Sequence, residues 1–317
     1  MTLHLTNGDS TVDTLRATGL DGDVFAWGDV LHDGPVPAGD RRTVRAARAG
    51  FLAATGWGSP AQLERELAER DQRLAAALGE RPLTLWFEHD LYDQLQLLEI
   101  LSFVDEGLVG TDLLTLIVVD HFPGRPDFKG LGELDAVELA SLWPQRRPLS
   151  ASDLAAARRG WAAFTAPDPR ALEEAARATD GGLSLLPVAL RRLLEDYPGA
   201  DDGLSRSERQ ILQAVADGAA DPVSIFLATM DAEEAPFSGD RQVWDKVSAL
   251  ASGPRPLLEV DELADRRVRL TADGEDSLAG RADAIALRGI DRWIGGVHLT
   301  GTARWRWDRQ RAAITGG

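Results

Sequence analysis

The sequence is informative first for what it lacks. None of its 317 residues is cysteine, which excludes disulfides, thiolate nucleophiles and thiolate metal sites. It has no run of about 18 apolar residues, so no membrane-spanning helix and no membrane partner are predicted. The opening "MTLHLTNGDST" lacks the basic and then apolar order of a signal peptide, so we expect a cytoplasmic protein.

Lysine is also scarce, and the 51 acidic residues outnumber the 34 basic ones. The formal net charge is -17, the isoelectric point is near 4.7, and lysine occurs only at Lys129 and Lys246. Such a surface repels polyanions, so nonspecific binding of nucleic acid by the whole surface is not expected. The hydrophobic share of 44% and the charged share of 27% are those of a globular protein, and the length favours two domains.

The first 145 residues alternate short apolar runs with helical patterns. The apolar runs are "LHLT", "DVFAW", "LTLWF" and "LLTLIVV". Strands that are apolar throughout and separated by helices are typical of a parallel sheet covered on both faces. We therefore predict an α/β domain over residues 1–145, with an open, mostly parallel, Rossmann-like sheet.

The rest of the chain has a different character. Ala- and Arg-rich helical patterns predict a helical connector over residues 146–200, which ends in the linker-like "PGADDG". Residues 201–317 are predicted to form a winged-helix-like α+β domain. Its pattern is three helices, the first capped by Ser205 with Glu208 three residues on, and then two strands joined by "DELADR". Trp305 and Trp307 alternate with arginines, which predicts a C-terminal β-hairpin.

Polar side chains follow the predicted strands of the first domain. The carboxyl ends of parallel strands meet at one edge of a sheet, where ligands bind, so we expect these side chains to converge. The set comprises Asn7, Gly8, Asp9, Ser10, Asp29, His32, Glu88, His89, Asp90, Asp93, Gln94 and His121.

The "TNGDST" segment has a glycine turn before a helix, as a phosphate-binding loop does, but it does not match the known motifs of such loops. It has neither GxGxxG nor GxxxxGK[ST] spacing, and Asp9 would place a carboxylate where a phosphate should lie. Capping of the following helix by Asp9 or Ser10 explains these residues better. A role for Asp9 beyond capping would be metal coordination or proton transfer.

The "LWFEHDLYDQLQLLEIL" segment carries the densest group of polar residues. Asp90 is a predicted N-cap and Asp93 complements the helix dipole, while Leu91, Leu95 and Leu98 form a buried face. This explanation leaves out Glu88 and His89, which lie where a crevice would open.

These residues suit acid–base chemistry or a divalent metal. We predict His89, His32, Asp9, Glu88 and Asp29 as catalytic or orienting groups. The need for a metal is left open, and its candidate ligands are His89, Asp90 and His121. Ligand contacts are predicted at Asn7, Gly8, Ser10, Asp90, Asp93 and Gln94.

Three motifs, "LHLTNGDST", "WGDVLHDGPVP" and "LWFEHDLYDQLQLL", resemble in that order the bacterial family known as domain of unknown function 1835. The resemblance covers about the first 145 residues. The closing "RWIGGVHLTG" and "RWRWD" are similar to the C-terminal end of longer members. The resemblance implies the domain division and a site at the motif residues, but no activity.

Two functions from different classes follow from these patterns. The first is an enzyme, or an enzyme-derived ligand-binding protein, that acts by hydrolysis or group transfer on a small polar substrate, phosphorylated or not. The second is a ligand-sensing regulator whose winged-helix-like domain contacts DNA or a protein partner. Residues 205–280 carry a charge of -7, which disfavours DNA, whereas residues 281–317 carry +4 with Trp293, Trp305 and Trp307 interleaved. These tryptophans could stack on nucleic acid or pack within the protein, and a homo-oligomer or a purely structural role is also open.

Overall fold

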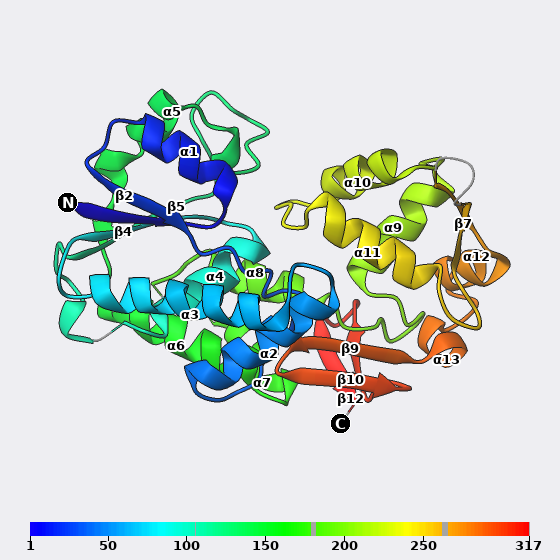
Figure 1. Ribbon diagram of the computed structural model, residues 1–317. Coiled ribbons are helices and arrows are strands. Elements are labelled where there is room, and N and C mark those ends of the chain that lie inside the picture. The colour runs from blue at the N-terminus through cyan, green and yellow to red at the C-terminus, as the bar shows by residue number, and fades with distance from the viewer. Residues whose placement is uncertain (105, 179–181, 262–265, 317) are drawn as a thin grey trace. The chain divides into compact units, whose positions relative to one another are not determined.

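The structure is a computed structural model that describes residues 1–104, 106–178, 182–261 and 266–316. The chain divides into two units (Figure 1). The first comprises Met1–Leu190 with Gly295–Val297, and the second comprises Arg191–Ile294 with His298–Gly317. Within the described residues, none of the helices has the length and apolar character needed to cross a membrane.

The first unit contains the predicted strands and helices. Its elements are β1 (Thr2–Thr6), α1 (Asp9–Ala17), β2 (Gly22–Ala26), β3 (Gly34–Pro35), α2 (Arg41–Ala54), α3 (Pro60–Ala77), β4 (Leu83–Glu88), α4 (Leu91–Leu101), β5 (Leu114–Val119), α5 (Ala136–Ser141), β6 (Arg147–Pro148), α6 (Ala151–Thr165), α7 (Pro169–Arg177) and α8 (Leu186–Leu194), with the 3-10 helices η1 (Glu106–Leu108), η2 (Leu131–Glu133) and η3 (Trp143–Gln145). The unit boundary falls inside α8.

The sheet of this unit has the strand order β2-β1-β4-β5-β6. The first four strands are parallel, and the two-residue β6 is antiparallel to β5. All six residues of β4 are buried, as expected for a strand covered on both faces. The predicted open, mostly parallel α/β sheet is therefore confirmed.

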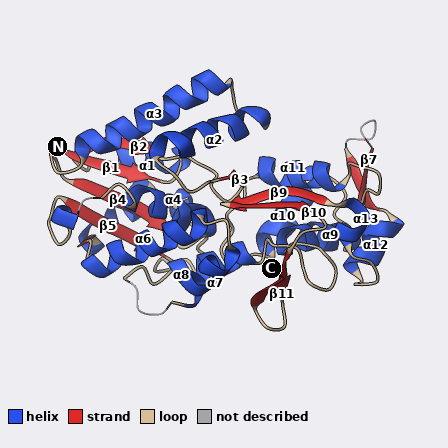
Figure 2. Ribbon diagram, turned by 90° about the horizontal axis from the view of Figure 1, so that it is seen from below, coloured by secondary structure: helices blue, strands red, loops and turns tan. Residues whose placement is uncertain are grey.

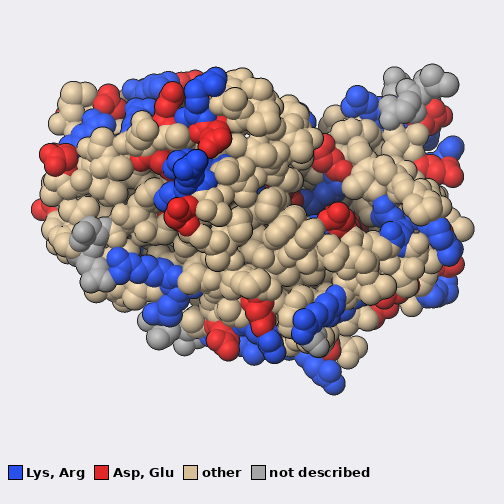
Figure 3. Space-filling view, turned by 60° about the horizontal axis from the view of Figure 1, so that its bottom comes forward, with Lys and Arg blue, Asp and Glu red and all other residues tan. Residues whose placement is uncertain are grey.

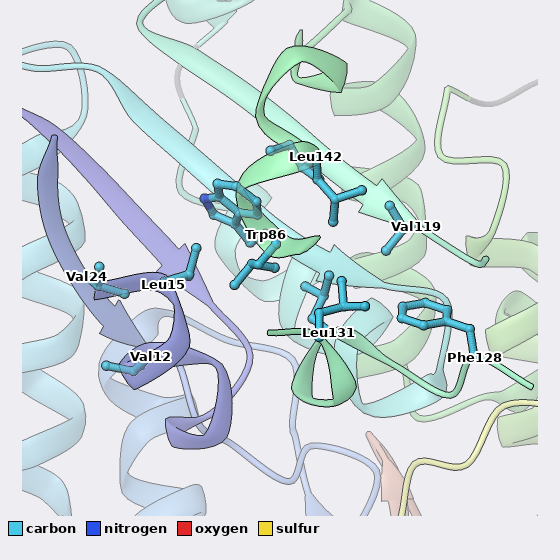
Figure 4. Close-up of a cluster of buried hydrophobic side chains, with 11 residues drawn as sticks. Val12, Leu15, Val24, Trp86, Val119, Phe128, Leu131 and Leu142 are labelled. Atoms are coloured by element: carbon cyan, nitrogen blue, oxygen red, sulfur yellow. The ribbon is translucent and has the colours of Figure 1, made fainter. Parts of the chain in front are cut away.

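Helices cover both faces of this sheet. In Figure 1, α1 and α5 lie on one face, and α3, α4 and α6 lie on the other. A cluster of buried side chains joins the sheet to α1 and to the loop after β5, with Trp86, Leu15 and Leu131 among its members (Figure 4). The Trp86 indole N–H donates to His4 Nδ1 at 3.1 Å, so the one polar atom of this large side chain has a partner.

Of the helices predicted as a connector, α6, α7 and the first part of α8 belong to the first unit. Helix α6 packs along α4 (Figure 2). The close approach depends on Gly160, where a Cβ would lie 2.9 Å from Leu98 Cδ2. That residues 1–145, 146–200 and 201–317 form separate domains stays a prediction.

The second unit is built from small helices and hairpins. Its elements are α9 (Arg206–Ala216), α10 (Pro222–Asp231), α11 (Asp240–Leu250), β7 (Leu258–Asp261), β8 (Arg267–Leu270), α12 (Ala272–Leu278), α13 (Ala284–Arg288), β9 (Ile290–Gly295), β10 (Val297–Gly301), β11 (Trp305–Asp308) and β12 (Ala313–Gly316). Strands β7 and β8 pair antiparallel, as do β11 and β12.

Several local predictions for this unit are confirmed. Ser205 and Glu208 form the predicted capping box of α9, and the C-terminal hairpin is present. Four residues of the predicted "DELADR" turn, 262–265, lie outside the described residues. The order of three helices and an antiparallel pair matches the pattern that predicted a winged helix, and that assignment stays a prediction.

Candidate functional site

The strand order places a switch point between β1 and β4. Strand β1 leads into α1 on one face of the sheet, and β4 leads into α4 on the other (Figure 1). Loops that leave neighbouring parallel strands toward opposite faces open a crevice at their carboxyl ends, which is where ligands bind in open α/β sheets. Asn7 follows β1 at this point, and Glu88 ends β4.

Three carboxylates meet at the switch point. Glu88, Asp90 and Asp93 are all buried and offer oxygen atoms within 4.8 Å of one another. We call these three residues the carboxylate cluster. Asp90 Oδ1 caps α4 by accepting from the Asp93 backbone N–H at 2.8 Å, and Asp93 Oδ2 accepts from the Glu88 backbone N–H at 2.7 Å. In the described part of the chain, the donors to the cluster are amides rather than basic side chains.

Asn7 binds the cluster together. Its Nδ2 donates to Glu88 Oε1 and to Asp93 Oδ1, both at 2.8 Å. Its Oδ1 accepts from the Gly8 backbone N–H at 2.7 Å. Its backbone carbonyl accepts from the Gly28 N–H at 2.9 Å and from the Tyr92 hydroxyl at 3.3 Å. One residue therefore joins the loops that follow β1, β2 and β4.

The cluster holds protons near neutral pH. Burial and the neighbouring charge of Asp90 raise the pKa of Glu88 to about 8, despite hydrogen bonds from Leu131 and Asn7. Burial raises the pKa of Asp90 to about 7. Burial, with the charges of Asp90 and Glu88, raises the pKa of Asp93 well above its ordinary value. Like charges in a dry site cannot all ionise together, so part of the cluster is neutral at pH 7.

A loop after β5 covers the cluster. The Leu131 backbone N–H donates to Glu88 Oε2 at 2.7 Å. The preceding residue is Gly130, where a Cβ would lie only 1.9 Å from the same oxygen. Only a residue without a side chain fits between the loop and the carboxylate.

A second buried polar group lies on the other side of Gly28. Arg48 donates to Asp29 through Nε at 3.1 Å and Nη2 at 2.7 Å, and also to the carbonyls of Asp33 and Val30. Around this pair, Arg41, Arg45 and Arg70 contact Asp71 and Glu99. We call this set the arginine network, and its members are Asp29, Arg41, Arg45, Arg48, Arg70, Asp71 and Glu99.

The arginine network fixes Trp27. The Trp27 indole N–H donates to Glu99 Oε2 at 2.5 Å, and its carbonyl accepts from Arg70 Nη1 at 3.2 Å. The Arg70 guanidinium also stacks over the Trp27 ring at 3.8 Å. Burial alone would raise the pKa of Asp29, but the charges of Arg48 and Arg70 hold it below its ordinary value.

A cleft of about 700 Å³ opens between these two polar groups. Its lining includes Gly8, Asp9 and Tyr92 from the segments after β1 and β4, Trp27 and Gly28 after β2, and residues of α3. The rim includes Trp57, which is 48% exposed. The volume suits a small organic ligand, and the lining is hydrogen-bonded to buried residues behind it.

No family model and no curated protein matches this chain.

The structure brings together some predicted site residues and separates others. Asn7, Glu88, Asp90 and Asp93 converge, and Gln94 joins them by donating to the Glu88 carbonyl at 2.6 Å. Gly8 and Asp9 line the cleft. Asp29 does not join this group, because it is paired with Arg48 in the arginine network.

The predicted histidines lie outside the cluster. His32 is buried, with its ring 6.0 Å from the Tyr92 ring, behind the cleft wall. His89 is half-buried, and burial lowers its pKa. The side chain of His121 is 85% exposed and contacts Asp120 at 2.6 Å. The expectation that the polar side chains after all four strands would lie together was therefore too broad.

The capping predicted for Asp9 and Ser10 is wrong. The N-cap of α1 is Gly8, and no side chain caps this helix. The Gly8 backbone N–H donates to the Asn7 side chain, and α1 has Gly8 as its N-cap, one residue before Asp9. Asp9 and Ser10 are exposed in the first turn.

The predicted divalent metal gains no support from hydrogen bonding. Both side-chain oxygens of Glu88 and both of Asp93 already accept hydrogen bonds from amides. The oxygens of Glu88, Asp90 and Asp93 nevertheless lie close enough together to hold a metal ion, and the raised pKa values of Glu88 and Asp90 apply to the cluster without one.

The C-terminal tryptophans pack within the second unit. Trp305 and Trp307 are buried, so their rings are not available to stack on bases. Among the described residues on the face in Figure 3, basic and acidic side chains are interspersed rather than gathered by sign.

Sequence reasoning missed Tyr92 and Trp57 of the cleft and the arginines behind it. One sequence signal did point to the site, because Asn7, which joins the cleft to the carboxylate cluster, is the only asparagine in the chain. The arginines gave no such signal, because arginine is abundant along the whole chain.

Proposed function

We propose that the first unit binds a small polar molecule in the cleft between the two polar groups and acts on it by hydrolysis or group transfer. The carrying observation is that Gly8, Gly28 and Tyr92, which all line the cleft, hydrogen-bond to Asn7, and Asn7 in turn holds the carboxylate cluster. Such support keeps binding groups in one geometry before the ligand arrives.

In this proposal the residues have different roles. Asp9 is the candidate catalytic carboxylate, because it is exposed and lines the cleft. Glu88, Asp90 and Asp93 are positioning residues, since they act on the cleft through Asn7. Trp57 and Tyr92 supply aromatic surface for a ligand ring.

We also propose membership of the family called domain of unknown function 1835. The motif residues that suggested it include Asn7, Gly8, Glu88 and Asp93, and these are the residues joined by hydrogen bonds at the switch point.

A thermal-shift and tryptophan-fluorescence screen of small polar metabolites tests the proposal, because a ligand of the native state raises the melting temperature. At least one compound is expected to raise it by several degrees, and Trp57→Ala should weaken that compound's binding by about tenfold, given the usual worth of an aromatic contact. Val137→Ala removes an exposed apolar side chain of the same unit outside the cleft and should leave binding unchanged. Binding that Trp57→Ala leaves intact would place the ligand elsewhere.

A further inference from the structure

The charges that line the cleft indicate what kind of ligand it can hold. Three carboxylates, Asp9, Glu66 and Glu69, line it together with two arginines, Arg70 and Arg73. An anionic ligand would need a cation that is not already engaged, whereas a donor-rich ligand would need acceptors.

Both arginines face other partners. Arg70 is buried and donates to the Trp27 carbonyl and to Glu99. Arg73 stacks on the Phe25 ring at 4.3 Å. Its charge also acts on Asp23, whose pKa is lowered by the hydrogen bond from Arg81 and by the charges of Arg81 and Arg73. Arg70 is therefore engaged, and the exposed Arg73 is the one guanidinium among the described lining residues that is set against the three exposed carboxylates.

The start of α1 does not compensate for this. A helix N-terminus attracts phosphate through its free amides and its dipole. Here the first helical residue is the exposed Asp9, which adds a negative charge beside the helix start, and the preceding Gly8 amide is bonded to Asn7. A phosphate at this point would meet a like charge.

The same residues favour hydrogen-bond donors on the ligand. The carboxylates of Asp9 and Glu69 are exposed at the cleft and accept from hydroxyl or amino groups. Trp57 and Tyr92 also line the cleft, and aromatic side chains are the residues on which planar rings stack.

Building on the proposed function, we propose that the cleft binds a nucleoside-like ligand, meaning a planar ring with hydroxyl and amino donors and without phosphate. Asp9 provides the discrimination, because it accepts from the ligand and repels a phosphorylated one.

The test compares each of the four common ribonucleosides with its 5′-monophosphate by isothermal titration calorimetry on the full chain. At least one nucleoside is expected to bind about tenfold more tightly than its monophosphate, the size of effect that one partly screened like charge can give. Asp9→Asn should reduce this ratio to about twofold. Asp13→Asn, on the exposed side of the same helix and outside the cleft, should keep the ratio of the unmodified protein.

The outcomes separate the two proposals. Tighter binding of any monophosphate than of its nucleoside overturns the inference, and so does a ratio that Asp9→Asn leaves unchanged. Failure of every nucleoside and monophosphate, with a Trp57-dependent hit elsewhere in the screen, overturns the inference and keeps the proposed function. Absence of any Trp57-dependent ligand overturns both. Binding of inorganic phosphate alone would also contradict the inference, because it requires an anion subsite.

Discussion

The carboxylate cluster and the arginine network are both buried, both polar and both next to the same cleft, yet they have opposite protonation behaviour. In the cluster, amides are the donors, and burial raises the pKa of Glu88 to about 8. In the network, guanidinium groups surround Asp29 and lower its pKa despite burial. The comparison shows that the partners of a buried carboxylate, more than its burial, decide whether it carries a charge.

The two groups also differ in how they connect to the cleft. The cluster reaches it through one neutral residue, Asn7, while the network reaches it directly through Arg70 and Trp27. Loss of a single partner should therefore be costly in both groups, but for different reasons and with a different dependence on pH.

The largest effect is expected from Arg48→Met. This substitution leaves Asp29 charged and buried without its main partner, which typically costs about 3 to 5 kcal/mol. Urea unfolding at pH 7 measures the change. The matched control is Arg42→Met, which removes an exposed arginine of the same helix and should change the unfolding free energy by less than about 0.5 kcal/mol. Equal effects of the two variants would mean that the network contributes nothing.

A smaller effect is expected from Asn7→Asp, a nearly isosteric change. It replaces the donor to Glu88 and Asp93 with a fourth acceptor, so we expect a loss of about 2 to 3 kcal/mol at pH 8. The loss should be smaller at pH 5, where the cluster holds more protons. Unfolding at both pH values gives the comparison.

Gln62→Glu is the control for that variant. It also places an acid beside an existing carboxylate, Glu66, but on the exposed face of α3. A loss of no more than about 0.5 kcal/mol is expected there. If Asn7→Asp were equally mild, the buried amide would not be holding the cluster.

The smallest effect concerns pH alone and uses Asp90→Asn. Because the pKa values of Glu88 and Asp90 are raised on folding, to about 8 and 7, the cluster stabilises the protein fully below about pH 4. This contribution is lost as the pH rises through 7 and 8. Asparagine keeps the N-cap and removes one charge, so between pH 5 and pH 8 the variant should lose about 1 to 2 kcal/mol less than the unmodified protein.

Asp40→Asn provides the opposite case. Asp40 is the exposed N-cap of α2, and hydrogen bonds from Thr43 lower its pKa. Its stabilising contribution is present above the ordinary carboxyl pKa, so this substitution should not reduce the loss between pH 5 and pH 8. A flatter profile in both variants would show that capping, not burial, sets the pH dependence.

Much of the fold could be predicted because the signals are local. The buried strand β4, the Asp90 cap and the apolar face of α4 each depend on residues within a few positions of one another, and each was predicted correctly. Convergence of Asn7 with Glu88 and Asp93 also followed, because parallel strand order brings strand ends together.

The arginine network could not be predicted in this way. Many of its contacts join residues far apart in the sequence, such as Asp29 with Arg48 at 19 positions and Trp27 with Glu99 at 72. The segment between β2 and β4 gave no strand pattern, and its two helices, α2 and α3, set these contacts only once they pack together. The pairing of Asp29 with Arg48 was consequently not predicted.

Gly130 shows that one position can decide the residue at another. Its φ of 167° is ordinary extended backbone that any residue adopts, so its own torsion does not require glycine. The requirement comes from Glu88, 42 positions earlier, whose carboxylate occupies the space that a side chain would need. Positions 88 and 130 therefore form a coupled pair, because a larger residue at 130 is compatible only with a shorter one at 88.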